Sequence, residues 1–187
     1  QQLAKGIELF ELDAPPTQEH KRRCLAKAGI EVPANLTYVP VNFNRDPMSD
    51  VLHAAGYDTG KKTLFMWEEV TYYLAPEAVD ATLAFIASQS PAGSMVAFDY
   101  IALWPGIMEA YGVKELIEFN ARHQSGESGN HFALEEGAVE SFLAQRGLRI
   151  ANLFNTEDME NSCLTLRDGT LLGHVTASFR ILQAVTV

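Results

Sequence analysis

Hydrophobic and polar positions along this chain form two alternating kinds of segment, short apolar runs and longer amphipathic stretches. Short apolar runs predict strands, and apolar residues that recur at helical spacing predict helices. The predicted strands are Ile7–Leu12, Leu36–Val41, Thr63–Trp67, Ser94–Tyr100, Leu148–Phe154 and Phe179–Val187. The predicted helices are Thr17–Ala28, a short one with Val51, Leu52 and Ala55, one that starts at Pro76, one near Lys114–His123, and Leu134–Gln145.

This order of segments predicts an α/β fold with a mostly parallel sheet and helices on both of its faces. The run Thr63–Trp67 is almost wholly apolar, as expected for a strand that is covered on both sides. In the helix that starts at Pro76, the residues Val79, Leu83 and Ile86 form one buried stripe. We therefore expect a Rossmann-like sheet in which each strand is followed by a packed helix.

The length of 187 residues is typical of one domain. The pattern loosens between residues 103 and 133, where Pro105, Gly112 and the segment Ser125–Gly129 interrupt it. An insertion between sheet elements often covers a ligand site. We predict a single, partial domain, 1–187, with a cap-like insertion at about 103–133.

The composition of the chain indicates which kinds of binding partner are disfavoured. The formal net charge of −10 disfavours nucleic acid, and no run approaches the ~20 apolar residues of a membrane span. The basic run Lys21–Arg23 is interpreted as a solvated helix face, with a phosphate site as the less favoured alternative. Two distant cysteines and the lack of a charged-then-apolar leader favour a cytoplasmic protein with reduced thiols, although one disulfide stays open.

The residues just past each strand are the candidates for chemistry, because ligands of open parallel sheets bind at the carboxyl ends of the strands. Asp13 follows the first strand and could accept hydrogen bonds from both hydroxyls of a ribose. Asn42 and Phe43 follow the second strand and suit the exocyclic amine and the flat face of an adenine. Each has a simpler alternative, since Asp13 could end the strand or cap a helix, Asn42 could serve a turn, and Phe43 could belong to the core.

An ordered series of segments resembles the leucine carboxyl methyltransferase family, which includes bacterial methyltransferases and polyketide O-methyltransferases. The matching segments are Phe10–Pro15, Lys21–Arg23 with Leu25, Val39–Phe43, Glu68–Leu74, Gly93–Tyr100, Gly126–Glu127 and Phe142–Gly147. The resemblance implies a class I methyltransferase fold that uses S-adenosyl-L-methionine. It places Asp13 on the ribose, Asn42 and Phe43 on the adenine, and Glu68 near the amino-acid portion of this cofactor.

The resemblance also implies roles for two tyrosines and shows three departures. Tyr73 matches a family tyrosine near the methyl acceptor and Tyr100 could line the same cleft, while core packing is an equal alternative for both. Family members usually carry aspartate at Asn42, and a small or apolar residue at Glu69. Their glycine-rich turn for the methionine part would precede Gln1, so we expect that this sequence is part of a longer methyltransferase whose first strand is missing here.

No catalytic residue can be named from these patterns. The five histidines show neither an i, i+4 pair nor clustering with cysteine, so a metal site is not indicated. His123 or His131 in the predicted cap could act as a general base, with an ordinary surface role as the favoured alternative. The sequence therefore predicts a methyltransferase acting on a small-molecule hydroxyl or carboxylate, with an NAD-type oxidoreductase or a non-catalytic binding module as the alternatives; its oligomeric state is not predicted.

Overall fold

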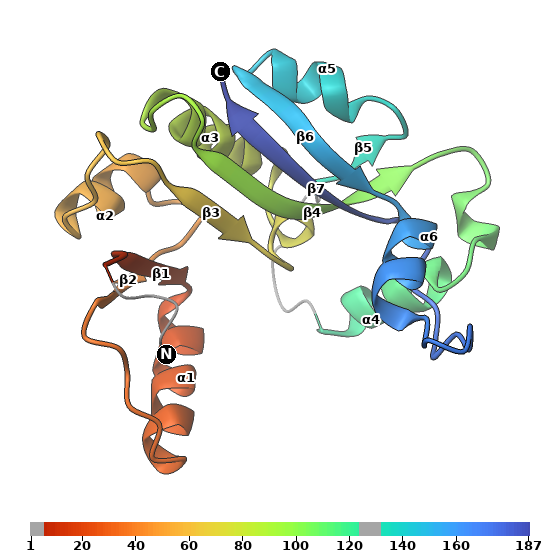
Figure 1. The fold of residues 1–187 in the computed structure, drawn as a ribbon, viewed down its shortest axis with the longest axis horizontal. Coiled ribbons are helices and arrows are strands. Elements are labelled where there is room, and N and C mark those ends of the chain that lie inside the picture. The colour runs from red at the N-terminus through yellow and green to blue at the C-terminus, as the bar shows by residue number, and fades with distance from the viewer. Residues whose placement is uncertain (1–5, 124–131) are drawn as a thin grey trace. The chain divides into compact units, whose positions relative to one another are not determined.

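A computed structural model describes residues 6–123 and 132–187, the side chains of 119–123 excepted, and the chain divides into two compact units. The first unit, Gln1–Asp58, contains a two-stranded parallel sheet and two helices. The second unit, Thr59–Val187, contains the larger sheet and the remaining helices (Figure 1). The two units are considered separately, and the prediction of a single domain stays a prediction.

The first unit consists of β1 (Leu9–Asp13), α1 (Pro15–Lys27), β2 (Leu36–Pro40) and α2 (Met48–Ala54). Two prolines open α1, where the missing backbone N–H groups have no helical partner to lose. The basic run lies on the solvent-exposed side of α1. There Lys21 pairs with Glu11 at 2.6 Å, and the Arg22 guanidinium lies 5.1 Å from the centre of the Tyr38 ring. These contacts support the interpretation of the run as a helix face.

The second unit is a mixed sheet in the order β3-β4-β7-β6, with β5 paired to β4. Its strands are β3 (Leu64–Trp67), β4 (Met95–Leu103), β5 (Leu134–Glu135), β6 (Leu148–Phe154) and β7 (Phe179–Thr186). β3 and β5 run parallel to β4, whereas β7 runs antiparallel to both β4 and β6. The α/β class is confirmed, but this sheet is less parallel than predicted, because β7 runs opposite to β4.

The helices of the second unit are α3 (Pro76–Ser88), α4 (Val113–His123), α5 (Val139–Ala144) and α6 (Thr156–Met159). Short helical turns at 71–73, 107–109 and 160–164 complete the unit. The predicted stripe of α3 is confirmed, since Val79, Leu83 and Ile86 are all buried. α6 begins with a reciprocal capping box in which Asn155 and Asp158 each bond the backbone of the other. No helix among the described residues is long and apolar enough to cross a membrane.

One face of the larger sheet carries the core of this unit. Phe65 contacts Phe85 of α3, and Trp67 contacts Phe98 of β4, so α3 packs on the face to which these rings point. The opposite face exposes three large apolar side chains, with 60% of Leu64, 66% of Met66 and 40% of Ile181 accessible to solvent.

One predicted element is wrong, and so is the expectation that no histidine lies close to a cysteine. The predicted helix Leu134–Gln145 is a short strand followed by a shorter helix, because residues 134–135 pair with β4 before α5 begins at Val139. His20 and Cys24 lie one turn apart in α1, with Nε2 and Sγ 3.5 Å apart, although no such pair was expected. Both cysteines are free and exposed.

Candidate functional site

In the first unit, the predicted ribose and adenine residues lie at one edge of the small sheet. β1 and β2 are parallel and in register, with Asp13 opposite Pro40, so their carboxyl ends meet at the same edge. The Val41 N–H donates to the Asp13 carbonyl at 3.0 Å, which places Asn42 and Phe43 directly beyond this edge. The structure therefore brings Asp13, Asn42 and Phe43 into the neighbourhood that the sequence predicted.

The local bonds of two of these residues bear on their roles. The Asp13 carboxylate is half-buried, and its Oδ1 accepts a bond of 2.7 Å from the Ala14 N–H, which orients it at the end of the strand. The Asn42 side-chain oxygen accepts a bond of 3.1 Å from the Asn44 N–H, the geometry of an Asx turn. The turn alternative for Asn42 is thus supported, and its role toward adenine stays a prediction. Phe43 is half-buried.

In the second unit, the turn after β3 is held by a residue that the sequence did not single out. The Asp99 carboxylate, through Oδ1, accepts a bond of 2.7 Å from the backbone N–H of Glu69. The Asp99 carbonyl accepts a bond of 2.5 Å from the Thr71 hydroxyl. Glu68 lies between β3 and these two anchored residues and is exposed. Glu68, which was predicted to contact the cofactor, therefore lies on a turn that Asp99 of β4 holds in place through these two hydrogen bonds.

Two tyrosines follow this turn and differ in exposure. The rings of Tyr72 and Tyr73 lie 4.6 Å apart, and 6% of Tyr72 but 43% of Tyr73 is accessible. Burial, reinforced by the negative charge of Asp99, raises the pKa of the Tyr72 hydroxyl well above its ordinary value. Tyr73, which the sequence predicted to lie near the methyl acceptor, is thus the more accessible of the pair. Its role stays a prediction.

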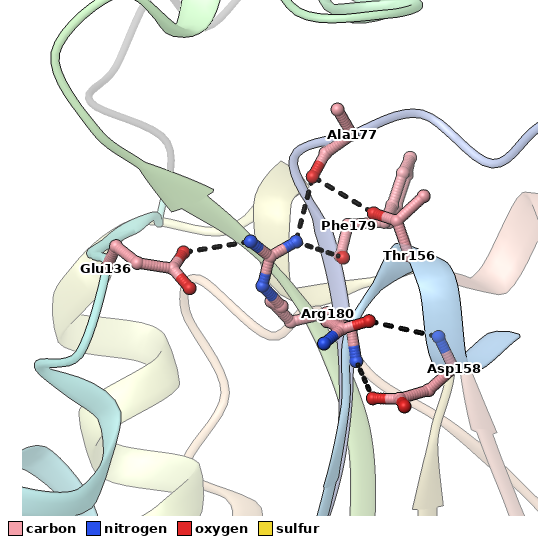
Figure 2. Close-up of polar contacts among 7 residues, drawn as sticks. Glu136, Thr156, Asp158, Ala177, Phe179 and Arg180 are labelled. Carbon is pink, nitrogen blue, oxygen red and sulfur yellow. Dashed lines mark hydrogen bonds and ion pairs between the residues drawn. The ribbon is translucent and has the colours of Figure 1, made fainter.

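Tyr100, the other tyrosine predicted to lie near the methyl acceptor, is buried in the second unit. Only 3% of it is exposed, and burial raises its pKa to about 12, with Glu136 raising it further and Arg180 opposing the shift. Figure 2 shows the neighbouring Arg180, which donates from Nη2 to Glu136 at 2.9 Å and from Nη1 to two backbone carbonyls. This environment favours the packing alternative for Tyr100.

A surface hollow lies at the start of α4. We call it the α4 hollow; its lining residues are Met108–Gly112, Lys114–Leu116, His174 and Thr176. Most of them belong to the insertion that the sequence predicted as a cap. His174 lines the hollow, contacts the Tyr111 ring at 5.0 Å and pairs through Nδ1 with the Glu160 carboxylate at 3.2 Å.

One backbone hydrogen bond and one aromatic contact link the α4 hollow to the helical turn that follows β3. The Thr176 carbonyl accepts a bond of 3.0 Å from the Phe179 N–H, and the Phe179 ring lies 5.5 Å from the ring of Tyr72. Of the histidines named as possible bases, His131 lies outside the described residues, as does the side chain of His123. His174 is not among the residues that the sequence singled out, because its partner Glu160 lies fourteen residues away and no local motif marks the pair.

Comparison with known proteins finds a family likeness over the first part of the chain. The sequence model of leucine carboxyl methyltransferase matches residues 1–87. The prediction drawn from the segment series is confirmed, and the residues predicted for the ribose and the adenine, Asp13, Asn42 and Phe43, fall inside the matched part.

The relatives of the chain carry the corresponding description. The Bacillus subtilis protein "Putative S-adenosyl-L-methionine-dependent methyltransferase YktD" is 28% identical over 173 residues, covering 91% of this chain and 55% of that protein. A Mycolicibacterium vanbaalenii protein of the same description is 36% identical over 104 residues, covering 56% of this chain and 33% of that protein. The chain thus spans about half the length, or less, of these relatives.

Solved structures agree in fold. The mitomycin 7-O-methyltransferase MmcR aligns with a TM-score of 0.58 at 13% identity, over 97% of this chain and 42% of that one. Magnesium protoporphyrin IX methyltransferase from Synechocystis PCC 6803, solved with bound SAH, aligns with a TM-score of 0.53 at 14% identity, over 97% and 65% of the two chains. At this identity the likeness establishes the class I methyltransferase fold alone.

Proposed function

We propose that this chain supplies the nucleoside-binding part of an S-adenosyl-L-methionine-dependent methyltransferase. The observation that carries the proposal is the shared edge of β1 and β2, where a half-buried carboxylate and an aromatic residue lie at adjoining strand ends. In this assignment Asp13 accepts hydrogen bonds from the ribose hydroxyls, and Asn42 and Phe43 contact the adenine. The family resemblance assigns Glu68 to the amino-acid portion of the cofactor.

The residues present fit a cationic donor of this kind. Glu68, Glu69 and Asp99 gather three carboxyl groups at or against the β3 turn, and their field favours a positive charge nearby. When bound, S-adenosyl-L-methionine supplies a methyl group whose sulfur leaving group is already activated. The protein's task is therefore alignment of the acceptor and exclusion of water rather than activation of the donor.

We assign the acceptor to the α4 hollow and to Tyr73, and the reaction to O-methylation of a small-molecule hydroxyl or carboxylate. The hollow combines apolar side chains such as Met108 and Leu116 with the polar groups of Lys114 and His174, a mixture that suits a small organic molecule. For a hydroxyl acceptor, the proton leaves the oxygen for Nε2 of His174, because Nδ1 faces Glu160. A carboxylate acceptor is already ionised and requires no base.

Calorimetry with S-adenosylhomocysteine and with NAD tests the proposed function. Binding of S-adenosylhomocysteine alone supports it, NAD binding alone would indicate an oxidoreductase, and binding of neither would indicate a module with another role. Asp13→Ala should weaken S-adenosylhomocysteine binding by ~1–3 kcal/mol, since the ribose bonds are lost. The matched control is Asp50→Ala, which removes an exposed carboxylate from α2 of the same unit.

A further inference from the structure

Asp99 holds the turn after β3 at two points. Its side chain accepts from the Glu69 N–H at 2.7 Å, and its backbone carbonyl accepts from the Thr71 hydroxyl at 2.5 Å. Thr71 is wholly buried, and Asp99 is 8% exposed, so water does not replace these bonds readily. One residue of β4 thus fixes both ends of the segment Glu69–Thr71.

The conformation held in this way is unfavourable by itself. Glu69 has a φ of 56°, and it is the one non-glycine residue with positive φ among the described residues. The left-handed region costs a residue with a side chain ~1–2 kcal/mol, so a contact from outside the turn must maintain it. The bond from the Glu69 N–H to Asp99 is such a contact.

The Asp99 carboxyl is itself costly to bury. Its second oxygen, Oδ2, is buried and makes no hydrogen bond to any described residue. Burial, with the nearby charges of Glu69 and Glu68 acting in the same direction, raises the pKa of Asp99 above its ordinary value, against the opposing effect of the bond from Glu69. A carboxyl in this environment contributes less to stability than an apolar side chain would, which indicates a role beyond packing.

We propose that Asp99 is a positioning residue that sets the β3 turn so that Glu68 and Tyr73 present their side chains to the ligands. Glu68 directly precedes the anchored residue Glu69, and Tyr73 follows the anchored residue Thr71 by two positions. Loss of either anchor displaces both side chains together. The ligand-directed part of this inference rests on the proposed function, whereas the two anchoring bonds do not.

Three substitutions separate positioning from charge. Asp99→Ala removes the acceptor for the Glu69 N–H, and we expect the dissociation constant for S-adenosylhomocysteine to rise about tenfold or more. Asp99→Asn retains an oxygen for that N–H and should bind within about threefold of the unaltered chain. Thr71→Val removes the second anchor, and its dissociation constant should lie between those of Asp99→Asn and Asp99→Ala.

Thr82→Val is the matched control for Thr71→Val. Thr82 is also buried, and its hydroxyl donates to the backbone carbonyl of Ala78 at 2.9 Å, but within α3 and away from the turn. We expect Thr82→Val to lower the melting temperature as much as Thr71→Val does, while leaving the dissociation constant unchanged. Equal losses of affinity in the two valine variants would overturn the proposal.

Calorimetry and amide hydrogen exchange on the full chain together decide the matter. The proposal is overturned if folded Asp99→Ala binds S-adenosylhomocysteine normally, or if Asp99→Asn is as impaired as Asp99→Ala, since charge and not position would then matter. If the unaltered chain binds no S-adenosylhomocysteine, the proposed function fails separately. Exchange at the Glu69 amide still reports on the anchor, and it should be slow in the unaltered chain and Asp99→Asn but fast in Asp99→Ala.

Discussion

Glu160 fixes the orientation of His174 at the edge of the α4 hollow. Its Oε1 lies 3.2 Å from Nδ1 of His174 and also accepts a bond of 2.9 Å from the Val175 N–H. The carboxylate is thus held by the backbone next to the histidine it contacts, and 18% of its side chain is accessible. An imidazole oriented by an anchored carboxylate suits the proton-transfer role that we propose for His174.

The Glu160–His174 pair gives the first prediction. For an acceptor with a hydroxyl group, His174→Ala should lower kcat by about 10²-fold or more, because the proton has no acceptor. Binding of S-adenosylhomocysteine should not change. Transfer rates measured with a panel of phenols and with the corresponding carboxylic acids check this, since the acids need no base; equal losses for both classes would reject a proton-transfer role. Glu160→Gln, which keeps the oxygen that contacts the Val175 N–H, should give a smaller loss than His174→Ala.

Arg180 gives a prediction about stability. Its guanidinium donates three bonds, one to the Glu136 carboxylate and two to backbone carbonyls (Figure 2). Of its side chain, 11% is accessible to solvent. Arg180→Met loses all three and should reduce the free energy of unfolding by about 2 kcal/mol. Glu136→Gln keeps an oxygen acceptor on a half-exposed side chain and should cost about 1 kcal/mol or less. Urea unfolding would contradict this account if Glu136→Gln were the more damaging change.

Tyr100 predicts a loss of stability at alkaline pH. Its pKa of about 12 in the folded chain exceeds the ordinary value of 10.0, so between these values the unfolded chain releases a proton that the folded chain keeps. The contribution is present below pH 10 and should fall by roughly 2 kcal/mol as the pH rises to 12. Tyr72 acts in the same direction.

Urea unfolding between pH 9 and 12 measures this slope. Tyr100→Phe should make the decline shallower, and Tyr111→Phe, which removes an exposed hydroxyl, serves as the matched control. Parallel curves for the unaltered chain and Tyr100→Phe would show that burial of this hydroxyl has no such effect.

Glu69 predicts an unusual response to glycine. The φ of Glu69 is 56°, a value that glycine adopts without strain and a β-branched residue does not. Glu69→Gly should therefore leave the free energy of unfolding unchanged or raise it by up to about 1 kcal/mol, whereas Glu69→Val should lower it by about 1–2 kcal/mol. The bond to Asp99 uses the backbone N–H and survives both changes. At the neighbouring Glu68, glycine should destabilise the chain. The same sign for glycine at both positions would mean that the Glu69 backbone is not strained.

Local patterns predicted most of the elements. The run Leu148–Phe154 coincides with β6, and the helix predicted from Pro76 begins at that residue, because proline at the first turn and a regular apolar stripe are local signals. The error at Leu134 arose because residues 134–135 become a strand only through pairing with β4, a tertiary contact that periodicity does not register.

The candidate site also contains residues that the sequence selects and one that it does not. Asp13 ends β1, and Asn42 and Phe43 come shortly after β2, so the rule for ligands at the carboxyl ends of strands selects them. Asp99 lies thirty residues from Glu69 and inside a strand that reads as ordinary core, so spacing gives no sign that its side chain fixes the β3 turn. Residues that act by holding others depend on distant contacts, and the structure is needed to find them.

We infer that the shared edge of β1 and β2 binds the nucleoside part of the cofactor. Isothermal titration of S-adenosylhomocysteine into the chain and into its Asp13→Ala and Asp50→Ala variants tests this inference, with melting temperatures confirming that each variant is folded. We predict one binding site per chain, a loss of ~1–3 kcal/mol in Asp13→Ala and no loss in Asp50→Ala. An unaltered chain that does not bind, or an affinity that is the same in Asp13→Ala, would contradict this inference.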